Sequence, residues 1–265
     1  MSSTAMVTAP PSGCVISSVI RREHQISFTT LGQVHGRRDS ELIDPLHSAG
    51  PLTHEVVASL LDPPDGGIVA DLGAGLGNFT ALLEQSGYNV IAVDIDEDDY
   101  REAGHSSAPF VVANLDQALP ELPGPLTGAV AIEVIEHLEN PLHFLRSVAD
   151  GLVEGGWLIV TTPNVLSLSS RLEFLVRGDD FQFSDADYRD NGHISPVSGK
   201  QLDRIASRVG LVIEATTYNV GRIPLPQLRK RVLLRGDWAR SQLLGEALIV
   251  KFRKRQDSAE PFTRG

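Results

Sequence analysis

Short, nearly continuous apolar runs alternate with segments of helical periodicity through the middle of this chain. Five of these runs are predicted as strands: residues 68–73, 89–95, 110–115, 128–134 and 156–162. Strands that lack a regular polar alternation are buried on both faces, and helices are the usual connections between parallel strands. The pattern therefore predicts an α/β protein with a parallel sheet covered by helices on both sides.

Helical spacing is clear in residues 51–61 and in residues 141–153. The DPPDGG segment, residues 62–67, ends the first of these helices because proline and glycine interrupt helical backbone. Towards the C-terminus, two further strand-like runs, 211–220 and 246–252, are separated by a stretch rich in proline and arginine. The chain shows no internal repeat, so a single sheet with its connecting helices is expected.

The domain organisation follows from the same pattern. One domain is predicted over residues 19–255, with a helical cover before its first strand and a substrate lid inserted at residues 164–192, after the fifth strand. Residues 1–18 are expected to be a disordered leader because they are too small and polar to bury a core. Residues 256–265 are expected to be a flexible tail.

Composition and charge narrow the class of protein. The 265 residues are 42% hydrophobic and 22% charged, and no apolar run approaches the roughly 20 residues that a membrane span needs. The net charge of −11 argues against nucleic-acid binding, because neutralising phosphates requires a basic surface. The single cysteine, Cys14, rules out an internal disulfide, and no positive charge precedes the weakly apolar N-terminus. A cytoplasmic protein that binds no nucleic acid is predicted.

The segment VADLGAGLGNFT, residues 69–80, places Gly73, Gly75 and Gly77 between a predicted strand and a predicted helix. Glycine leaves the backbone bare, so a ligand can approach it closely, and amides at a helix N-terminus attract an anionic group. A dinucleotide fingerprint needs its third glycine one position later, where this chain has Asn78. The spacing counts against a dinucleotide, although a tight strand-to-helix turn also uses glycine for structural reasons.

Asp94 ends the second predicted strand, 21 residues after Gly73. A carboxylate at this position can accept hydrogen bonds from both hydroxyls of a ribose, each contributing about 1.5–3 kcal/mol. NAD enzymes recognise ribose at the same place, so Asp94 does not discriminate between cofactors. A solvated acid in a turn is the alternative interpretation.

The segment AIEVIEHLENP, residues 131–141, closes the fourth predicted strand. Together with the D-x-G-x-G-x-G pattern that begins at Asp71, it resembles the class I S-adenosylmethionine-dependent methyltransferases. The resemblance is to the branch that includes ubiquinone-biosynthesis O-methyltransferases and many small-molecule or glycan methyltransferases, and it extends over about residues 69–210. It implies a doubly wound, Rossmann-like, seven-stranded sheet in which 211–220 and 246–252 form a terminal antiparallel pair.

The resemblance also implies S-adenosylmethionine as the cofactor and S-adenosylhomocysteine as the product. The expected reaction is methyl transfer to a small-molecule acceptor, with a hydroxyl of a secondary metabolite, quinone-like compound or sugar intermediate as the expected group. A non-catalytic methyltransferase-like binding protein and an NAD-dependent oxidoreductase are the alternatives. The expected cofactor contacts are Asp71, Gly73, Ala74, Gly75, Gly77, Asp94, Ile95, Asn114, Leu115 and Glu133.

Two positions depart from the family pattern. Where the family commonly has an aspartate that approaches the adenine amino group, this chain has Asn114, with Asp116 as an alternative. The asparagine carbonyl can still accept a hydrogen bond from an amino group. Before the fourth strand the family often has Phe-Asp, and this chain has Thr127 and Gly128. That second position is expected to support folding rather than chemistry.

Methyl transfer from a sulfonium needs mainly alignment and exclusion of water, but a hydroxyl nucleophile benefits from a base. His193 and His137 are therefore the candidate catalytic residues, since histidine has a suitable pKa. Alternatively, His193 fixes the lid onto the domain, and His137 caps or packs the helix that follows it. Glu133 or Glu136 is expected to line the methionine end of the cofactor or to cap that helix, and Glu133 is the better-placed contact.

The expected lid contains Phe174, Phe181, Phe183 and Tyr188 together with five aspartates. The aromatic side chains form either an apolar acceptor pocket or the lid's own small core. The aspartates have neither an accompanying histidine cluster nor the pattern of a calcium loop. No metal site is therefore predicted.

The segment PLPQLRKRVLLRGDWARSQLLG, residues 224–245, combines basic residues with a helical spacing of Leu228, Val232 and Leu233. We expect a helix packed on the sheet with its arginines in solvent. Contact of this basic segment with a membrane surface or an acidic carrier is the alternative. The sequence carries no indication of the oligomeric state.

Overall fold

The computed structural model describes residues 49–50, 52–180, 182–225, 230–233 and 236–256. The predicted leader, residues 1–18, lies outside the described residues, as do residues 19–48 of the expected N-terminal cover. All but the first residue of the predicted tail, residues 257–265, also lies outside them.

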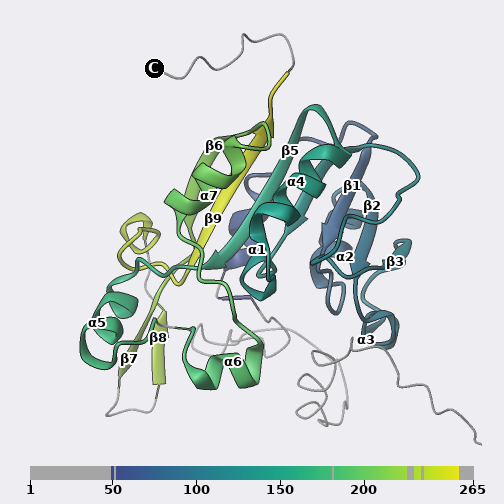
Figure 1. Ribbon diagram of the computed structural model, residues 1–265. Helices are drawn as coiled ribbons and strands as arrows, with labels where there is room; N and C mark the ends of the chain where they lie inside the picture. Colours follow the sequence, from purple (N-terminus) through teal and green to yellow (C-terminus); the bar gives the residue numbers. More distant parts are fainter. Residues whose placement is uncertain (1–48, 51, 181, 226–229, 234–235, 257–265) are drawn as a thin grey trace, which may run out of the picture.

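A seven-stranded sheet forms the centre of the protein (Figure 1). Its strands are β1 (Ile68–Leu72), β2 (Asn89–Asp94), β3 (Phe110–Val112), β4 (Leu126–Ala131), β5 (Leu152–Pro163), β6 (Leu211–Tyr218) and β9 (Ala247–Lys254). They lie in the order β3-β2-β1-β4-β5-β9-β6, and β9 runs antiparallel to both of its neighbours. The predicted doubly wound sheet is confirmed, and its terminal antiparallel pair forms because β9 inserts between β5 and β6.

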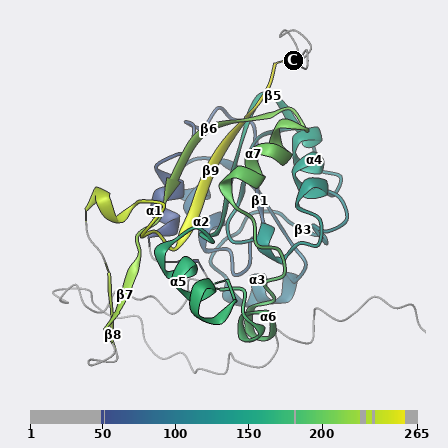
Figure 2. The same ribbon diagram turned by 60° about the vertical axis from the view of Figure 1, so that its left-hand side comes forward.

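Helices cover both faces of this sheet. They are α1 (Thr53–Ala58), α2 (Asn78–Gln85), α3 (Glu97–Ala103), α4 (Pro141–Gly151), α5 (Leu168–Arg177), α6 (Asp185–Asn191) and α7 (Gly199–Ser207), with 3-10 turns η2 (Ile135–His137) and η4 (Asp237–Ala239). Helices α4 and α7 pack together on one face, whereas α1 and α2 lie on the other (Figures 1 and 2). Within the described residues, no helix is both long enough and apolar enough to cross a membrane.

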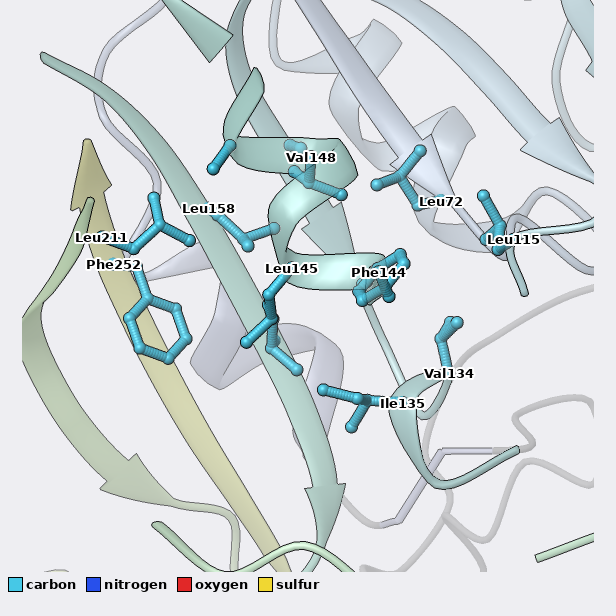
Figure 3. Packing of buried hydrophobic residues seen from close by; sticks show 14 of the residues in the cluster. Leu72, Leu115, Val134, Ile135, Phe144, Leu145, Val148, Leu158, Leu211 and Phe252 are labelled. Atoms are coloured by element: carbon cyan, nitrogen blue, oxygen red, sulfur yellow. The ribbon is translucent and has the colours of Figure 1, made fainter. Parts of the chain in front are cut away.

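Alternate side chains of the central strands build a core on each face of the sheet. Along β5, Leu158 and Val160 belong to the cluster that contains α4, whereas Ile159 belongs to the cluster that contains α2. Successive strand residues point to opposite faces, which produces this division. Figure 3 shows the first cluster, in which Phe144 of α4 and Leu72 of β1 are both buried. Burial of each such side chain contributes about 1.5–3 kcal/mol, so both faces hold the sheet together.

The residues predicted as a lid, 164–192, fold largely as the helices α5 and α6. Figures 1 and 2 show both helices beyond the end of the sheet at which the parallel strands finish. Each helix begins at a serine: the Ser167 side chain accepts a hydrogen bond from the Ser170 amide, and the Ser184 side chain accepts one from the Asp187 amide. Capping of this kind satisfies amides that have no partner within the helix, so the serines determine where both helices start.

Residues 224–245 do not form the expected helix. Instead, β7 (Arg222–Leu225) and β8 (Lys230–Leu233) form a separate two-stranded antiparallel sheet, followed by η4. Pro224 lies within β7, and proline is costly inside a helix because it removes an amide donor and clashes with the preceding turn. An edge strand tolerates it. The side chains of residues 222–235, and with them the considered membrane or carrier contact, lie outside the described residues.

Candidate functional site

The loop from β1 to α2 has a backbone shape that glycine permits. Gly73, Gly75 and Gly77 have φ angles of 78°, 51° and 80°, in a region that L side chains rarely adopt. A Cβ on Gly73 would lie 2.4 Å from Val134 Cγ2, and one on Gly77 would lie 2.7 Å from Tyr100 Cε2. A Cβ on Gly75 would have no described atom within 4 Å. The outer two glycines therefore allow close packing, whereas the backbone at Gly75 has no described atom near the place of a side chain.

Asp94, at the end of β2, lies beside this loop. Its Oδ2 accepts a hydrogen bond from the Gly75 amide at 2.7 Å. The amides of Gly73 and Ala74 donate to the Val93 carbonyl at 2.8 and 3.2 Å, which holds the loop against β2. Because each carboxylate oxygen can accept more than one hydrogen bond, Asp94 keeps acceptor capacity for the hydroxyls of a ribose. The structure thus brings the predicted ribose acid and the predicted glycine loop together.

Two apolar residues predicted to contact the cofactor differ in their exposure. Ile95, which follows Asp94 directly, is 54% exposed. Its amide donates to Asp94 Oδ1 at 2.6 Å, so its position relative to the carboxylate is fixed. Leu115 is buried and belongs to the core on the α4 face. Ile95 therefore offers an exposed apolar surface next to Asp94. Leu115 instead anchors the loop after β3 in the hydrophobic core.

Asn114 and Asp116, the polar residues expected near adenine, each accept a hydrogen bond from a backbone amide. The Asp116 amide donates to Asn114 Oδ1 at 2.9 Å, which closes a turn after β3. The Glu139 amide donates to Asp116 Oδ1 at 2.7 Å. Each acceptor oxygen has a second lone pair, so a contact of Asn114 or Asp116 with adenine stays a prediction.

Asp71 lies behind the glycine loop and is buried. Thr80 Oγ1 donates to Asp71 Oδ2 at 2.6 Å, which ties β1 to α2. Burial, with a smaller effect of the Asp94 charge, raises the pKa of Asp71 to about 6. The carboxyl therefore shapes the loop from within the protein, and a direct contact with the cofactor stays a prediction.

The chain leaves β4 through a strained residue. Glu133 has a φ of 53°, which is uncommon for a residue with a side chain and costs on the order of 1–3 kcal/mol. Its amide donates to Thr161 Oγ1 at 2.9 Å, and that hydroxyl donates to Glu133 Oε1 at 2.6 Å. Burial raises the pKa of Glu133. These contacts with β5 hold Glu133 at the end of the sheet, where it was predicted to line the cofactor.

Glu136, one turn further along the chain, is fully buried. Neither of its carboxylate oxygens has a hydrogen-bond partner among the described residues. Burial, and then the charge of Glu133, raises the pKa of Glu136 well above its usual value. A buried carboxyl group without a partner is costly, and such an arrangement is expected at functional sites rather than in an ordinary core.

The two candidate catalytic histidines lie together. The ring centroids of His137 and His193 are 4.9 Å apart, with an edge-on angle of 71°. His193 Nδ1 lies 2.7 Å from the Gln182 carbonyl, and His137 Nδ1 lies 3.3 Å from the Gly192 carbonyl. Burial, and then His193, lowers the pKa of His137. Because a carbonyl only accepts, Nδ1 of each ring is the donor in these two contacts.

A family model for a methyltransferase domain matches residues 37–216, which is more than half of the chain. The chain belongs to the class I S-adenosylmethionine-dependent methyltransferases. The predicted family and its cofactor, S-adenosylmethionine, are therefore confirmed. This assignment replaces the NAD-dependent oxidoreductase alternative.

Curated relatives of this methyltransferase include ubiquinone biosynthesis O-methyltransferases. The one from Caulobacter sp. (strain K31) is 33% identical over 108 residues, which are 38% of this chain and 43% of that protein. The one from Xanthomonas campestris pv. campestris (strain B100) is 29% identical over 126 residues, which are 45% of this chain and 52% of that protein. The chain spans about half the length of the curated relatives that it matches.

Solved methyltransferase structures share the fold. An S-adenosylmethionine-dependent methyltransferase from Mesorhizobium loti has a TM-score of 0.51 and 17% identity, covering 76% of this chain and 96% of that one. A putative methyltransferase from Bacillus halodurans has a TM-score of 0.56 and 14% identity, covering 78% of this chain and 100% of that one. At these identities the likeness supports the sheet and its helices alone.

The structure also explains two further positions in this methyltransferase. Asn140, not His137, caps α4, because its side-chain oxygen accepts from the His143 amide at 3.0 Å. A Cβ on Gly128 would lie 2.2 Å from Trp157 Cε2. The departure from the family pattern at this position therefore makes room for an aromatic ring on β5, as the folding interpretation predicted.

The aromatic residues of the lid do not gather into one pocket among the described residues. Phe183 contacts His193, with ring centroids 5.4 Å apart. Phe174 and Tyr188 are each 59% exposed. Phe181 lies outside the described residues. Of the described lid aromatics, Phe183 is thus the one whose ring contacts a candidate catalytic histidine.

Glu136, His137 and His193 each offer one ligand atom, and these atoms all lie within 4.8 Å of one another. A carboxylate and two imidazoles are a common donor set for divalent transition metals. Sequence reasoning missed this cluster because it considered the lid aspartates and took the two histidines separately. The signal that could have found it is the Glu-His pair after β4 combined with a histidine directly after the lid.

Proposed function

We propose that this protein transfers the methyl group of S-adenosylmethionine to a hydroxyl of a small-molecule acceptor. The observation that carries the proposal is the grouping at one edge of the sheet. The glycine loop and Asp94 form one part of this edge, and His137 and His193 form another. Val134 connects the two parts. Its side chain packs against Gly73 of the glycine loop, and it precedes His137 by three residues in the chain.

Each part of the cofactor has a proposed set of contacts. Asp94 accepts hydrogen bonds from the ribose hydroxyls, and Ile95 covers one side of the adenine. The backbone of residues 73–77 approaches the methionine portion, with Glu133 at its far end. These assignments are supported by the exposure of Ile95, the space at Gly75 and the fixed orientation of the Asp94 carboxylate.

The reaction is an in-line displacement at carbon. An acceptor oxygen forms a bond to the methyl carbon while the carbon–sulfur bond breaks, and the electron pair of that bond stays on sulfur. S-adenosylhomocysteine and a methyl ether result, and the hydroxyl proton is lost. Alignment and exclusion of water supply most of the rate enhancement, and we propose that His137 and His193 promote loss of the proton.

A hydroxyl acceptor is favoured by two observations. The relatives described above are named O-methyltransferases, although they match this chain over only part of their length. Loss of a hydroxyl proton requires a group that can assist, and the side chains of His137 and His193 lie together at this edge with chemistry that suits this role. The proposed acceptors are a secondary metabolite, a quinone-like compound or a sugar intermediate.

Calorimetric titration with S-adenosylhomocysteine, and separately with NAD, tests the cofactor site. We expect micromolar binding of S-adenosylhomocysteine and no binding of NAD. Asp94→Ala and Gly75→Arg should abolish the former, whereas Asp99→Ala, which removes an exposed acid from α3, should leave it unchanged. Folded Asp94→Ala and Gly75→Arg proteins that still bind with the affinity of the natural chain would refute the site.

Turnover separates an enzyme from a non-catalytic binding protein. Phenolic, catecholic and sugar acceptors should be screened with labelled S-adenosylmethionine, and the label should appear in a methyl ether of at least one of them. Tight binding of S-adenosylhomocysteine without transfer to any acceptor would favour the binding-protein alternative. Transfer to nitrogen or carbon would contradict the proposed hydroxyl acceptor.

A further inference from the structure

We propose that a groove between α4 and α7 binds a small organic anion, a carboxylate or phosphate monoester that carries an apolar body. Figures 1 and 2 show the two helices side by side, and they contact each other. The groove has a volume of about 390 Å³, which lies in the range of small-molecule sites. None of the residues that line it is a proposed cofactor contact or a candidate catalytic histidine, so this site is independent of the proposed function.

Two arginines form the charged side of the groove. Arg204 lies on α7, and Arg208 follows one helical turn later, directly after the last residue of that helix. Both are exposed, and neither takes part in an ion pair found among the described residues. Like charges one helical turn apart repel each other. A guanidinium group binds the oxygens of a carboxylate or phosphate in a bidentate manner, so one anion between the two arginines would remove this repulsion.

The other polar side chains of the groove also present donors. The Asn140 side-chain oxygen accepts a hydrogen bond from the His143 amide at 3.0 Å. The Gln201 side-chain oxygen accepts hydrogen bonds from the Ser198 amide at 2.8 Å and from the Ser198 hydroxyl at 2.9 Å. Each of these two oxygens thus serves the start of its own helix, and the NH₂ group, which only donates, is left for a ligand. The polar part of the groove therefore consists of donors, which suits the oxygens of an anion.

Apolar side chains form the rest of the groove: Pro141, Leu142, Val197 and Ile205. Val197 is buried in the core on the α4 face of the sheet, and Ile205 packs against that core. Removal of apolar surface from water is favourable in proportion to its area. A ligand therefore gains affinity from an apolar body that lies on these side chains, whereas acetate or inorganic phosphate would leave them in water.

The groove differs in charge from the protein as a whole. The chain has a net charge of −11, yet none of the eight residues that line the groove is acidic. A concave region lined by positive charge attracts anions and raises their local concentration. Charge complementarity therefore selects an anion over a neutral or cationic ligand of the same shape.

Calorimetric titration of the full-length protein with four simple probes tests this selection. Octanoate and monooctyl phosphate each combine an anionic group with an apolar chain, whereas octanamide lacks the charge and acetate lacks the chain. We expect saturable binding of one equivalent of octanoate, of monooctyl phosphate or of both, and the tighter of the two identifies the preferred anionic group. Octanamide and acetate should each bind at least about tenfold more weakly, because each loses one of the two contributions.

Variants of the groove locate the binding. Arg204→Gln and Arg208→Gln should each weaken binding of the tighter probe by about tenfold, as expected for loss of a charged hydrogen bond. Arg240→Gln, which removes an exposed arginine outside the groove, is the matched control and should bind as the natural chain does. Leu142→Ala should weaken binding of the same probe, whereas Leu175→Ala, an exposed apolar change on α5, should not.

Melting temperatures show that each variant is folded, and the exposed positions of both arginines make loss of the fold unexpected. A natural chain that binds neither octanoate nor monooctyl phosphate would overturn the proposal. So would binding of octanamide as tight as that of octanoate, or equal binding by folded Arg204→Gln and Arg208→Gln proteins. S-adenosylhomocysteine should bind both arginine variants as it binds the natural chain, which separates a failure of this site from a failure of the proposed function.

Discussion

Asp71 and Glu136 are two buried carboxyl groups whose oxygens find different partners. Asp71 accepts a hydrogen bond from Thr80, whereas neither oxygen of Glu136 has a partner among the described residues. Burial disfavours the charged form of both groups and raises the pKa of each. Asp71 is thus tied to α2 through Thr80, whereas Glu136 has no hydrogen bond of this kind to a neighbouring helix.

The titration of Asp71 predicts a pH dependence of stability. Its pKa is raised from 3.8 to about 6 in the folded protein, so the folded state binds the proton more tightly than the unfolded state. The resulting cost, about 3 kcal/mol at most, is absent below about pH 4 and complete above about pH 6. Asp71→Asn should therefore gain stability relative to the natural chain as the pH rises from 4 to 7.

Urea unfolding of both proteins at several pH values between 4 and 8 measures this difference. Asp190→Asn, which changes an exposed acid on α6, is the control and should show no such trend. A difference between Asp71→Asn and the natural chain that stays constant with pH would contradict the assignment of a raised pKa to Asp71.

Gly128 predicts a packing effect at a single position. A Cβ there would lie 2.2 Å from the Trp157 ring, so Gly128→Ala should destabilise the protein by about 1–3 kcal/mol through overpacking. Gly124→Ala is a matched control, because its Cβ would lie 3.5 Å from Ile68 Cδ1 at an ordinary contact distance. Thermal denaturation should show a lower melting temperature for Gly128→Ala alone, and equal melting temperatures would count against the packing explanation.

At the scale of elements, β9 is held by ion pairs between side chains as well as by its backbone hydrogen bonds to β5 and β6. Lys251 has a side chain only 7% exposed and lies 2.5 Å from Asp62 Oδ1 and 3.1 Å from Glu214 Oε1. Arg253 contacts the same two carboxylates. Asp62 follows α1, and Glu214 lies on β6. The four charges therefore join the segment after α1 to β9 and β6.

Removing one charge from this network should weaken the protein. Asp62→Asn leaves Lys251 with one carboxylate, and we expect a loss of about 1–3 kcal/mol at neutral pH, less than for a fully buried pair. The hydrogen bond from Arg253 is the main cause that lowers the pKa of Asp62. The stabilisation by this carboxylate is therefore present above the usual aspartate pKa and is lost as the pH falls through its lowered value.

Chemical unfolding at neutral and acidic pH measures this prediction. The stability difference between Asp62→Asn and the natural chain should shrink in acid, where the natural carboxylate takes up a proton. Glu55→Gln, an exposed change on α1, should have little effect at either pH. An Asp62→Asn protein as stable as the natural chain at neutral pH would show that the network contributes nothing.

At the scale of the whole molecule, the proposed cofactor residues and the candidate catalytic histidines meet at one edge because parallel strands end on the same side of a sheet. Ligands of open α/β sheets bind in the crevice beyond these carboxyl ends. The loops after β1 and β2 carry the glycines and Asp94, and the segment after β4 carries Glu136 and His137. The segment between α6 and α7 adds His193, so the proposed cofactor contacts and the candidate catalytic residues lie on neighbouring loops.

This arrangement predicts that binding of the cofactor product stabilises the protein. At 100 times its dissociation constant, S-adenosylhomocysteine should add about 2.7 kcal/mol of stability. Asp94→Ala should lose that increase, whereas Asp99→Ala should keep it. Thermal shifts of the two variants with S-adenosylhomocysteine measure this, and an undiminished shift in a folded Asp94→Ala protein would contradict the prediction.

The sequence by itself determined most of the sheet and the cofactor loop. Strand and helix periodicities act over a few residues, so the five parallel strands, α1 and α4 could be located from spacing alone. The glycine loop and Asp94 were also accessible because their geometry depends on short segments at strand ends. The interpretation of residues 224–245 was wrong because a helical spacing was followed across Pro224, which suits the edge strand β7 instead.

Only the tertiary structure decided which polar groups meet. His193 reaches His137 because the backbone amides of Ile194 and Ser195 donate to the Glu136 carbonyl, a contact that no local pattern encodes. The burial of Glu136 without a partner likewise depends on everything packed around it. Local spacing specifies elements, whereas the convergence of side chains from distant segments is specified by packing and backbone hydrogen bonds between those elements.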